Sequence, residues 1–270
     1  MDRCLLKNII ILILVLVNAF LLGSLIMRHS STTKARHQAE EQLVALFAAD
    51  GIELSEDSIS HETPPPALSL TRNLQREQAA AAFFLGDDME QTDLGGGSYT
   101  YSSSVGAARF HPNGSFDIVS SLSSSDEVEK LCRKFCRTFS YEDPVFSPEE
   151  DGGSFSAAVC LWGSYPVFNC AVTFTYDGGS LLTVSGTLLP EDGTATSGTQ
   201  KLLSASAALT TFQQARRESY MVVSAITDLY LCYELQGSTA SALSLSPAWC
   251  IVTDTANHYV NCVTGAVSSG

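Results

Sequence analysis

The chain has 270 residues, 45% of them hydrophobic, and it carries 29 acidic against 15 basic side chains, for a formal net charge of −14. This acidic balance argues against nucleic acid and anionic lipid as partners of its folded part. The length and apolar content favour one large or two modest domains with real cores rather than a disordered chain.

An uncharged, apolar run extends from Ile9 to Met27 and predicts a membrane-spanning helix. At about 1.5 Å rise per residue, such a run covers roughly 28 Å, close to the hydrocarbon thickness of a bilayer. A cleaved signal peptide is the alternative, but the run continues past the small pair Gly23 and Ser24 and no A-x-A site follows. A short head before a long tail favours a signal anchor that exports the tail. We therefore expect a single-pass cell-membrane protein with residues 1–8 cytoplasmic and an extracytoplasmic ectodomain.

The segment after the predicted span, residues 28–67, is expected to form a stalk helix and a proline-rich spacer. Apolar residues at helical spacing continue to Phe47, and Gly51 follows where a C-terminal cap belongs. The three consecutive prolines at positions 64–66 cannot continue a helix and favour an extended chain. We place the first domain boundary at these prolines.

Beyond the prolines, one order of elements recurs three times: a helix, then short alternating strands. The predicted helices cover residues 74–85, 126–139 and 206–217. The predicted strands cover residues 98–103, 105–110, 115–120, 155–162, 167–176, 180–188, 222–235, 248–253 and 258–263. We expect an α+β fold in which one N-terminal transmembrane helix precedes about three helix-plus-antiparallel-meander modules in two lobes. Residues 68–198 would form the first lobe and residues 199–270 a C-terminal module.

Turn residues between these strands support hairpins. Asn113-Gly114 predicts a type I′ turn, because both residues tolerate the positive φ that this turn requires. Asp177-Gly178-Gly179 predicts a second tight turn. Both lie between alternating segments, so we expect antiparallel pairing across them.

Cysteines are unusually frequent after the predicted span. The seven in this part are Cys132, Cys136, Cys160, Cys170, Cys232, Cys250 and Cys262. An oxidising exterior permits disulfides, and the pairs Cys250 with Cys262 and Cys160 with Cys170 are each symmetric about a predicted turn. Cross-strand neighbours have Cβ atoms roughly 4.5–5.5 Å apart, near disulfide spacing. Each pair is a candidate disulfide, with two core cysteines as the alternative.

Motifs for catalysis or metal binding are missing from the sequence. No histidine falls in H-E-x-x-H or beside a second histidine at ligand spacing, no G-x-S-x-G occurs, and the glycines at 95–97 lack the lysine of a phosphate loop. Cys132 and Cys136 fall on an apolar helical stripe, which favours core packing. We therefore expect no catalytic, cofactor-binding or metal-ligating residues and no enzyme. An enzyme would need a polar site assembled from distant residues.

Two short motifs near the C-terminus carry a family resemblance. They are P-A-W-C-I-V from Pro247 to Val252 and Y-V-N-C-V-T-G-A-V from Tyr259 to Val267. This arrangement resembles PepSY-like modules. Together with the single span, the helix ending at Gly51 and a tyrosine-rich strand after the next helix, the chain resembles the YycI and YycH group of Gram-positive bacteria.

This resemblance implies a non-enzymatic, membrane-anchored regulator without a cofactor. Its implied partner is the sensor histidine kinase of a cell-wall two-component system, of the WalK or YycG type, with a homologous co-regulator as a second membrane partner. Asn18, within the span, is the side chain able to hydrogen-bond across a helix interface, a contact worth on the order of 1 kcal/mol, and a merely tolerated polar residue is the alternative. The second expected function is an anchored PepSY-like binding module for a secreted peptidase, a peptide or a cell-envelope component, which an exposed edge strand would serve.

Overall fold

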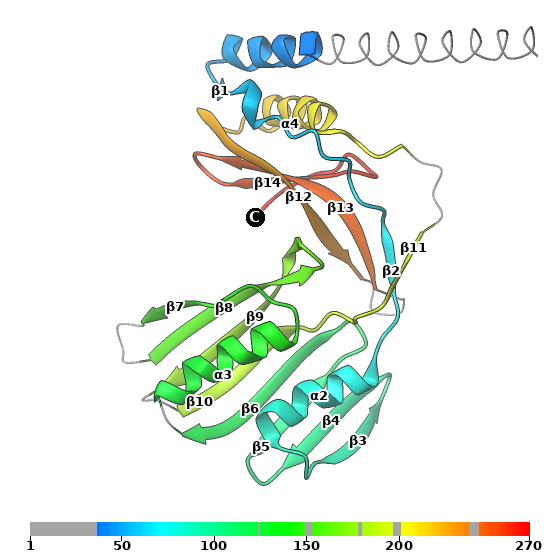
Figure 1. The fold of residues 1–270 in the computed structure, drawn as a ribbon, viewed down its shortest axis with the longest axis vertical. Helices are drawn as coiled ribbons and strands as arrows, with labels where there is room; N and C mark the ends of the chain where they lie inside the picture. The colour runs from blue at the N-terminus through cyan, green and yellow to red at the C-terminus, as the bar shows by residue number, and fades with distance from the viewer. Residues whose placement is uncertain (1–36, 124, 149–152, 178–179, 197–200, 238–242) are drawn as a thin grey trace, which may run out of the picture.

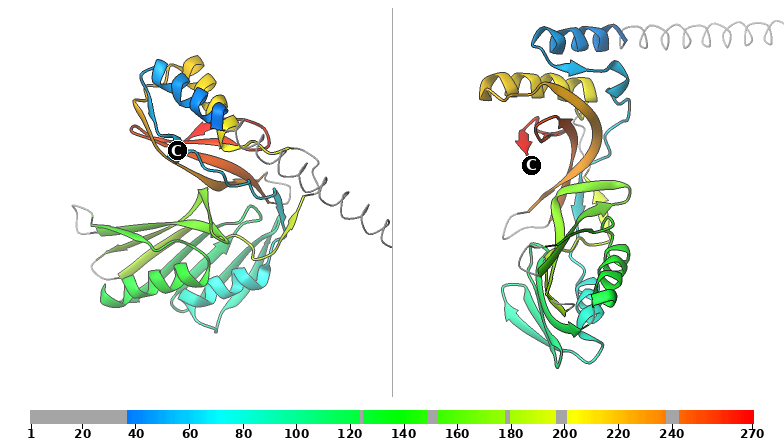
Figure 2. Two further views of the ribbon diagram at one scale, coloured as in Figure 1. Left: turned by 45° about the horizontal axis from the view of Figure 1, so that its top comes forward. Right: turned by 90° about the vertical axis from the view of Figure 1, so that its left-hand side faces the viewer.

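The computed structural model describes residues 37–123, 125–148, 153–177, 180–196, 201–237 and 243–270. It shows an elongated molecule of two lobes whose strands belong to one sheet (Figure 1). We call residues 68–196 the central lobe, and residues 37–59 together with 201–270 the terminal lobe. Because the terminal lobe combines two distant parts of the chain, its first helix lies beside elements near the C-terminus (Figure 2).

In the central lobe, α2 (Leu74–Leu85) and α3 (Ser125–Thr138) cover one face of the sheet (Figure 2). Asn73 begins α2 by accepting a hydrogen bond from the N–H of Arg76 at 3.1 Å, and Gly86 ends it with a φ of 81°. The strands of this lobe are β2 (Leu68–Leu70), β3 (Glu90–Gly95), β4 (Ser98–Ser103), β5 (Gly106–Phe110), β6 (Ser115–Ser123), β7 (Val145–Pro148), β8 (Gly153–Trp162), β9 (Tyr165–Asp177), β10 (Ser180–Thr187) and β11 (Gly193–Ala195).

Phe135 of α3 is the centre of the aromatic core in the central lobe. It is fully buried, and six other rings lie with centroids between 4.6 and 6.3 Å from its own. These rings belong to Phe83, Phe84, Phe116, Phe139, Tyr141 and Phe174. The apolar stripe of α3 therefore meets the inward side chains of the strands and of α2 at one point, as expected for a helix that covers a sheet.

The terminal lobe places two helices on one face of its strands (Figures 1 and 2). Its helices cover residues 37–49 and α4 (Ala205–Ser219), and a 3₁₀ helix, η1 (Glu56–Ser58), lies between the first helix and the central lobe in sequence. Its strands are β1 (Glu53–Leu54), β12 (Ala225–Gln236), β13 (Ser244–Thr253), β14 (Asn257–Asn261) and β15 (Val267–Ser269). Trp249 is buried at the centre of this core and donates its indole N–H to the carbonyl of Leu203 at 3.0 Å.

The two lobes are joined where β9 runs parallel to β12 and where β2 pairs antiparallel with β13. Next to the β9–β12 pairing, the side-chain amide of Asn169 takes the place of a backbone partner for Leu235 of β12. Its NH₂ group donates to the Leu235 carbonyl and its oxygen accepts from the Leu235 N–H, both at 2.8 Å. The rings of Phe168 and Tyr259 stack 3.7 Å apart beside it. Main-chain pairing and ring contact thus connect the lobes.

The predicted α+β class is wrong. The described residues are 44% strand and 26% helix, and their strands form one sheet rather than separate meanders. Strands from two of the predicted modules, β9 and β12, pair with each other. Pairing between modules covers an edge of each that would otherwise leave unpaired backbone groups, while β3 remains an exposed edge of the joined sheet.

Among the residues that the structure describes, no helix is both long enough and apolar enough to cross a bilayer. The predicted span from Ile9 to Met27, with Asn18 in it, lies outside those residues. Its insertion and orientation therefore stay predictions from sequence.

Candidate functional site

The helix over residues 37–49 is docked into the terminal lobe. Leu43 is 6% exposed and Phe47 is fully buried, and both belong to the core that contains Trp249. After the helix, Gly51 takes a φ of 76° and the N–H of Ile52 donates to the carbonyl of Phe47 at 3.0 Å, which confirms the predicted glycine cap. Sequence spacing predicts a stalk at this position. In the structure, the apolar side of the helix packs against the core of the terminal lobe.

Asp50 ties the end of this helix to the end of α4. Its Oδ2 atom accepts hydrogen bonds from Gln213 at 2.7 Å, Arg216 at 2.5 Å and Arg217 at 2.9 Å. The hydrogen bond from Arg217, with the charges of both arginines, lowers the pKa of the Asp50 carboxyl below its usual value. The carboxylate therefore remains charged and clamps the two helix ends at neutral pH.

An apolar groove of about 310 Å³ separates the two helices further along. Leu43 and Leu46 line one side, and Ala207 and Thr210 of α4 line the other. Leu46 is 38% exposed. The first helix is therefore tightly packed at its C-terminal end, where Phe47 is buried, and more exposed to solvent beside this groove.

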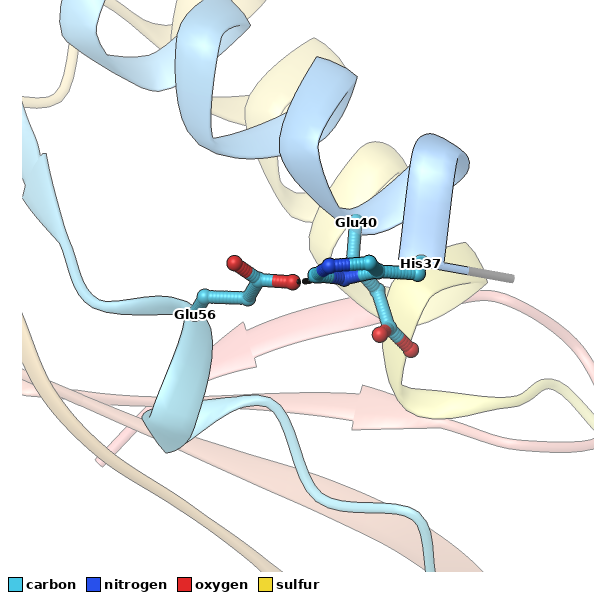
Figure 3. A group of neighbouring side chains, drawn as sticks. All are labelled: His37, Glu40 and Glu56. Atoms are coloured by element: carbon cyan, nitrogen blue, oxygen red, sulfur yellow. Dashed lines mark ion pairs between the residues drawn. The ribbon is translucent and has the colours of Figure 1, made fainter. Parts of the chain in front are cut away.

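A cluster of histidines and glutamates lies at the start of the first helix (Figure 3). His37 Nδ1 forms an ion pair with Glu56 of η1, and His37 Nε2 lies 3.8 Å from Glu41. Glu40, which is 4% exposed, has its Oε1 atom 3.5 Å from Nδ1 of His61. Three donor atoms, one each from His37, Glu40 and Glu56, lie within 4.8 Å of one another.

Sequence reasoning missed this cluster. Helical spacing alone places His37 beside Glu40 and Glu41, since residues three and four apart share a helix face. Glu56 and His61 come from later turns, and no fixed spacing relates them to His37. The local signal was the H-x-x-E-E order in a helix, and only the fold adds the remaining donors.

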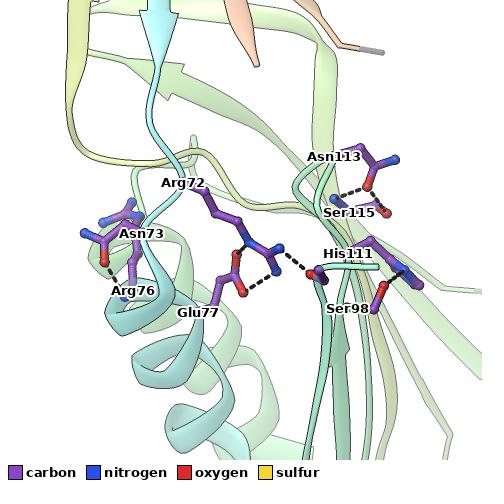
Figure 4. Close-up of polar contacts among 9 residues, drawn as sticks. Arg72, Asn73, Arg76, Glu77, Ser98, His111, Asn113 and Ser115 are labelled. Atoms are coloured by element: carbon purple, nitrogen blue, oxygen red, sulfur yellow. Dashed lines mark hydrogen bonds and ion pairs between the residues drawn. The ribbon is translucent and has the colours of Figure 1, made fainter. Parts of the chain in front are cut away.

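A buried ion pair holds the start of α2 in the central lobe (Figure 4). Arg72 forks onto the carboxylate of Glu77 with hydrogen bonds of 2.6 and 2.8 Å, and it also donates to the carbonyl of Gly97. Hydrogen bonding to Glu77 raises the pKa of Arg72. Because Glu77 is 6% exposed, this pairing is needed to offset the loss of its hydration.

Arg76, on the same helix, connects α2 to the segment between β10 and β11. It donates to the carbonyls of Leu189 at 2.8 Å and Phe139 at 2.9 Å, and it pairs with Glu191. A cleft of about 250 Å³ lies beside this pair and is also lined by Trp162. These contacts account for the donors of a buried guanidinium, so we assign Arg76 a structural role.

The hairpin near this network differs from the predicted type I′ turn. Only Gly114 has a positive φ, of 81°, and the hydrogen bond from His111 N–H to the carbonyl of Ser115 closes a longer loop. Asn113 instead accepts hydrogen bonds from the backbone and hydroxyl of Ser115 at 3.1 and 2.8 Å (Figure 4). This side-chain turn removes the need for a positive φ at Asn113. The predicted turn at residues 177–179 lies largely outside the described residues.

The candidate disulfide between Cys250 and Cys262 is not formed. Cys250 lies opposite Tyr259 in the register of β13 and β14, and the N–H of Cys262 bonds to the carbonyl of Pro247. An odd offset of three residues puts the two thiols on opposite faces of the sheet, and they belong to different core clusters. The sequence prediction fails because the turn is centred earlier than expected.

The other candidate pair, Cys160 and Cys170, does come together. Both thiols donate to the carbonyl of Thr187, at 3.3 and 3.6 Å, and the hydroxyl of Tyr141 donates to the same oxygen at 2.7 Å. The structure holds both as free thiols, and burial raises the pKa of Cys160 well above its usual value.

All seven described cysteines are free and buried. Burial raises the pKa of Cys132, Cys136 and Cys262 to about 12. A thiol with such a pKa carries almost no thiolate at neutral pH, so it is a poor nucleophile and metal ligand. The structure assigns these cysteines to core packing.

Comparisons with known proteins supply no family for this chain. No family model and no curated protein matches it. A solved structure of an uncharacterized protein from Eubacterium rectale is similar at a TM-score of 0.44 and 12% identity, over 77% of this chain and 80% of that one.

Proposed function

We propose that this chain is a membrane-anchored extracytoplasmic regulator that associates with a sensor histidine kinase of a cell-wall two-component system and modulates it. The kinase, of the WalK or YycG type, and a homologous co-regulator are the partners that the resemblance to the YycI and YycH group implies. The predicted span from Ile9 to Met27 supplies the anchor, and the protein itself performs no catalysis.

The docked first helix is the observation that supports this proposal. A passive tether needs only a flexible linker between the membrane and the folded part. Here the chain after the predicted span enters a helix whose Phe47 is buried in the core and whose end is clamped at Asp50. A shift of the ectodomain would therefore move this helix with it, and a change at the membrane would reach the core in the same way.

The test compares three forms of the full chain in native membranes, with kinase output and cross-linked co-purification as readouts. Replacing Ile9 to Met27 by an unrelated span should abolish both kinase recovery and regulation. Inserting flexible Gly-Ser residues directly before His37 should keep recovery but weaken regulation, because the insertion lengthens the chain between the predicted span and the docked helix. The same insertion between Gly163 and Ser164, in the exposed hairpin of β8 and β9, is the control and should change neither readout.

Two results would contradict the regulator. One is the same kinase output in all forms of the chain, and the other is failure to recover a kinase with the form that keeps its native span. Regulation by a soluble ectodomain fragment equal to that of the anchored chain would also contradict the coupling.

One observation favours the second candidate, an anchored binding module for a secreted peptidase, a peptide or a cell-envelope component. Strand β3 lies at the end of the strand order, and all six of its residues are exposed, with Leu94 at 51%. An exposed edge offers unpaired backbone groups for strand addition. Replacing Thr92 by proline would block pairing along this edge, so loss of a captured secreted protein in that variant, with kinase output unchanged, would favour the binding module.

A further inference from the structure

We infer that His37, Glu40 and Glu56 form a binding site for one divalent transition-metal cation, with His61 as the fourth donor. The site would join the start of the first helix to η1 and to the segment after it. This inference concerns the residues of the cluster alone and does not depend on the identity of the proposed partner.

The donors converge from three separate segments. His37 and Glu40 lie one turn apart on the first helix, Glu56 lies on η1, and His61 follows it. Figure 3 shows the His37 ring and the Glu56 carboxylate pointing at each other below the helix, with Glu40 beside them. An ion held by these donors would therefore tie the first helix to η1 and to the segment after it.

The distances bring three donors near the spacing that a shared ion requires, with His61 beside one of them. The three donor atoms lie within 4.8 Å of one another, and His61 Nδ1 lies 3.5 Å from Glu40 Oε1. Donors that share one tetrahedral zinc ion at about 2.0–2.2 Å lie roughly 3.3–3.6 Å apart. The side chains of His37, Glu56 and His61 are 60%, 39% and 58% exposed, so rotation toward a common centre meets little packing.

The chemistry of the donors selects the class of ion. Two imidazole nitrogens and two carboxylates suit Zn²⁺ and its transition-metal neighbours, whereas Ca²⁺ and Mg²⁺ prefer oxygen alone. The second ring nitrogen of His37 lies 3.8 Å from Glu41, close enough for a charge interaction but too far for a hydrogen bond. Glu40 is 4% exposed, so it is the buried donor of the set, whereas the other three lie nearer the surface.

Zinc binding to the purified full chain in detergent micelles tests the inference, with zinc sulfate as the probe and calorimetry as the readout. We expect one Zn²⁺ per chain, and at least a tenfold loss of affinity in both His37→Ala and Glu56→Gln. Glu62→Gln is the matched control, because Glu62 is an exposed carboxylate next to His61 in the sequence. The hydrogen bond from Glu62 to the Ser60 hydroxyl comes from its backbone N–H, so the substitution keeps that bond. This control should bind zinc as the unmodified chain does.

Cobalt substitution separates this site from the cysteines. Co²⁺ held by imidazole and carboxylate lacks the intense sulfur-to-metal charge-transfer band that thiolate ligands produce. Absence of 1:1 zinc binding at millimolar zinc, equal binding by His37→Ala, or a thiolate band in the cobalt form would each overturn the inference. Circular dichroism of each variant shows that a loss of binding does not come from unfolding.

Discussion

The two lobes differ in how the chain builds them. The central lobe comes from one continuous stretch and closes around the ring of Phe135, whereas the terminal lobe joins residues 37–59 to residues 201–270. Elements close in sequence find each other at low entropic cost, while the first helix must close a long loop to reach its place. Its attachment relies on Phe47 and Asp50 near one end and the histidine–glutamate cluster at the other. We therefore predict that the central lobe is the more stable of the two and that the first helix opens before it.

The largest expected effect is in the aromatic core. Phe135→Ala should reduce the free energy of unfolding by about 3–5 kcal/mol, because it removes a fully buried ring and leaves a cavity among six others. Urea unfolding of the full chain in micelles measures it. Phe146→Ala, a partly buried ring under Arg133, should cost much less, and equal losses in both variants would refute a core centred on Phe135.

The next effect concerns the buried ion pair of the central lobe. Arg72→Ala should cost about 2–3 kcal/mol of unfolding free energy, because it leaves the buried carboxylate of Glu77 without its partner, although partial exposure of Arg72 moderates the loss. The exposed Arg109 of β5 provides the control, and Arg109→Ala should change stability little. A loss in Arg72→Ala no larger than in this control would show that the pair contributes nothing.

A smaller, pH-dependent effect is expected in the terminal lobe. His258 is 5% exposed beside the ring of Phe212, neither of its ring nitrogens has a hydrogen-bond partner among the described residues, and burial lowers its pKa from 6.5. The unfolded chain therefore binds a proton more readily than the folded chain. Stability is fully present above the unfolded value and falls as the pH drops from about 6.5 through the lower folded value.

His258→Phe should flatten this dependence, since the phenyl ring keeps the packing and has no charge to gain. Thermal unfolding of both forms between about pH 8 and about pH 5 measures it. Parallel curves for His258→Phe and the unmodified chain would mean that His258 is not the group responsible.

The smallest effect is expected at the clamp on the first helix. Because the pKa of Asp50 is lowered, its contribution is present at neutral pH and is lost as the pH falls through that lowered value. Asp50→Asn should therefore speed hydrogen exchange in residues 37–49 and leave α2 and α3 unchanged. Asp87→Asn, on an exposed turn, is the control. Faster exchange across both lobes would contradict separate release of the first helix.

Local pattern predicted α2, α3, α4 and the longer strands approximately, but it missed β1, β2, β3, β7, β11 and β15. The predicted helix over residues 74–85 coincides with α2, and the predicted strand over 98–103 coincides with β4. Asn73 and Gly86 explain this accuracy, because a cap at each end makes the bounds a property of neighbouring residues. The hairpin between β13 and β14 was harder, since its turn is centred earlier than expected and Cys250 faces away from Cys262.

Composition and periodicity by themselves determined the acidic balance, the apolar stripes of the helices, the approximate positions of three helices and of the longer strands, and the glycine cap at Gly51. The tertiary structure alone decided that these elements share one sheet, that Phe47 docks a predicted stalk into the core, and that His37 meets Glu56. The physical reason is the distance along the sequence over which each interaction acts. Backbone hydrogen bonding and side-chain periodicity act over a few residues, whereas the choice of partner depends on which distant apolar faces and strand edges can be buried together.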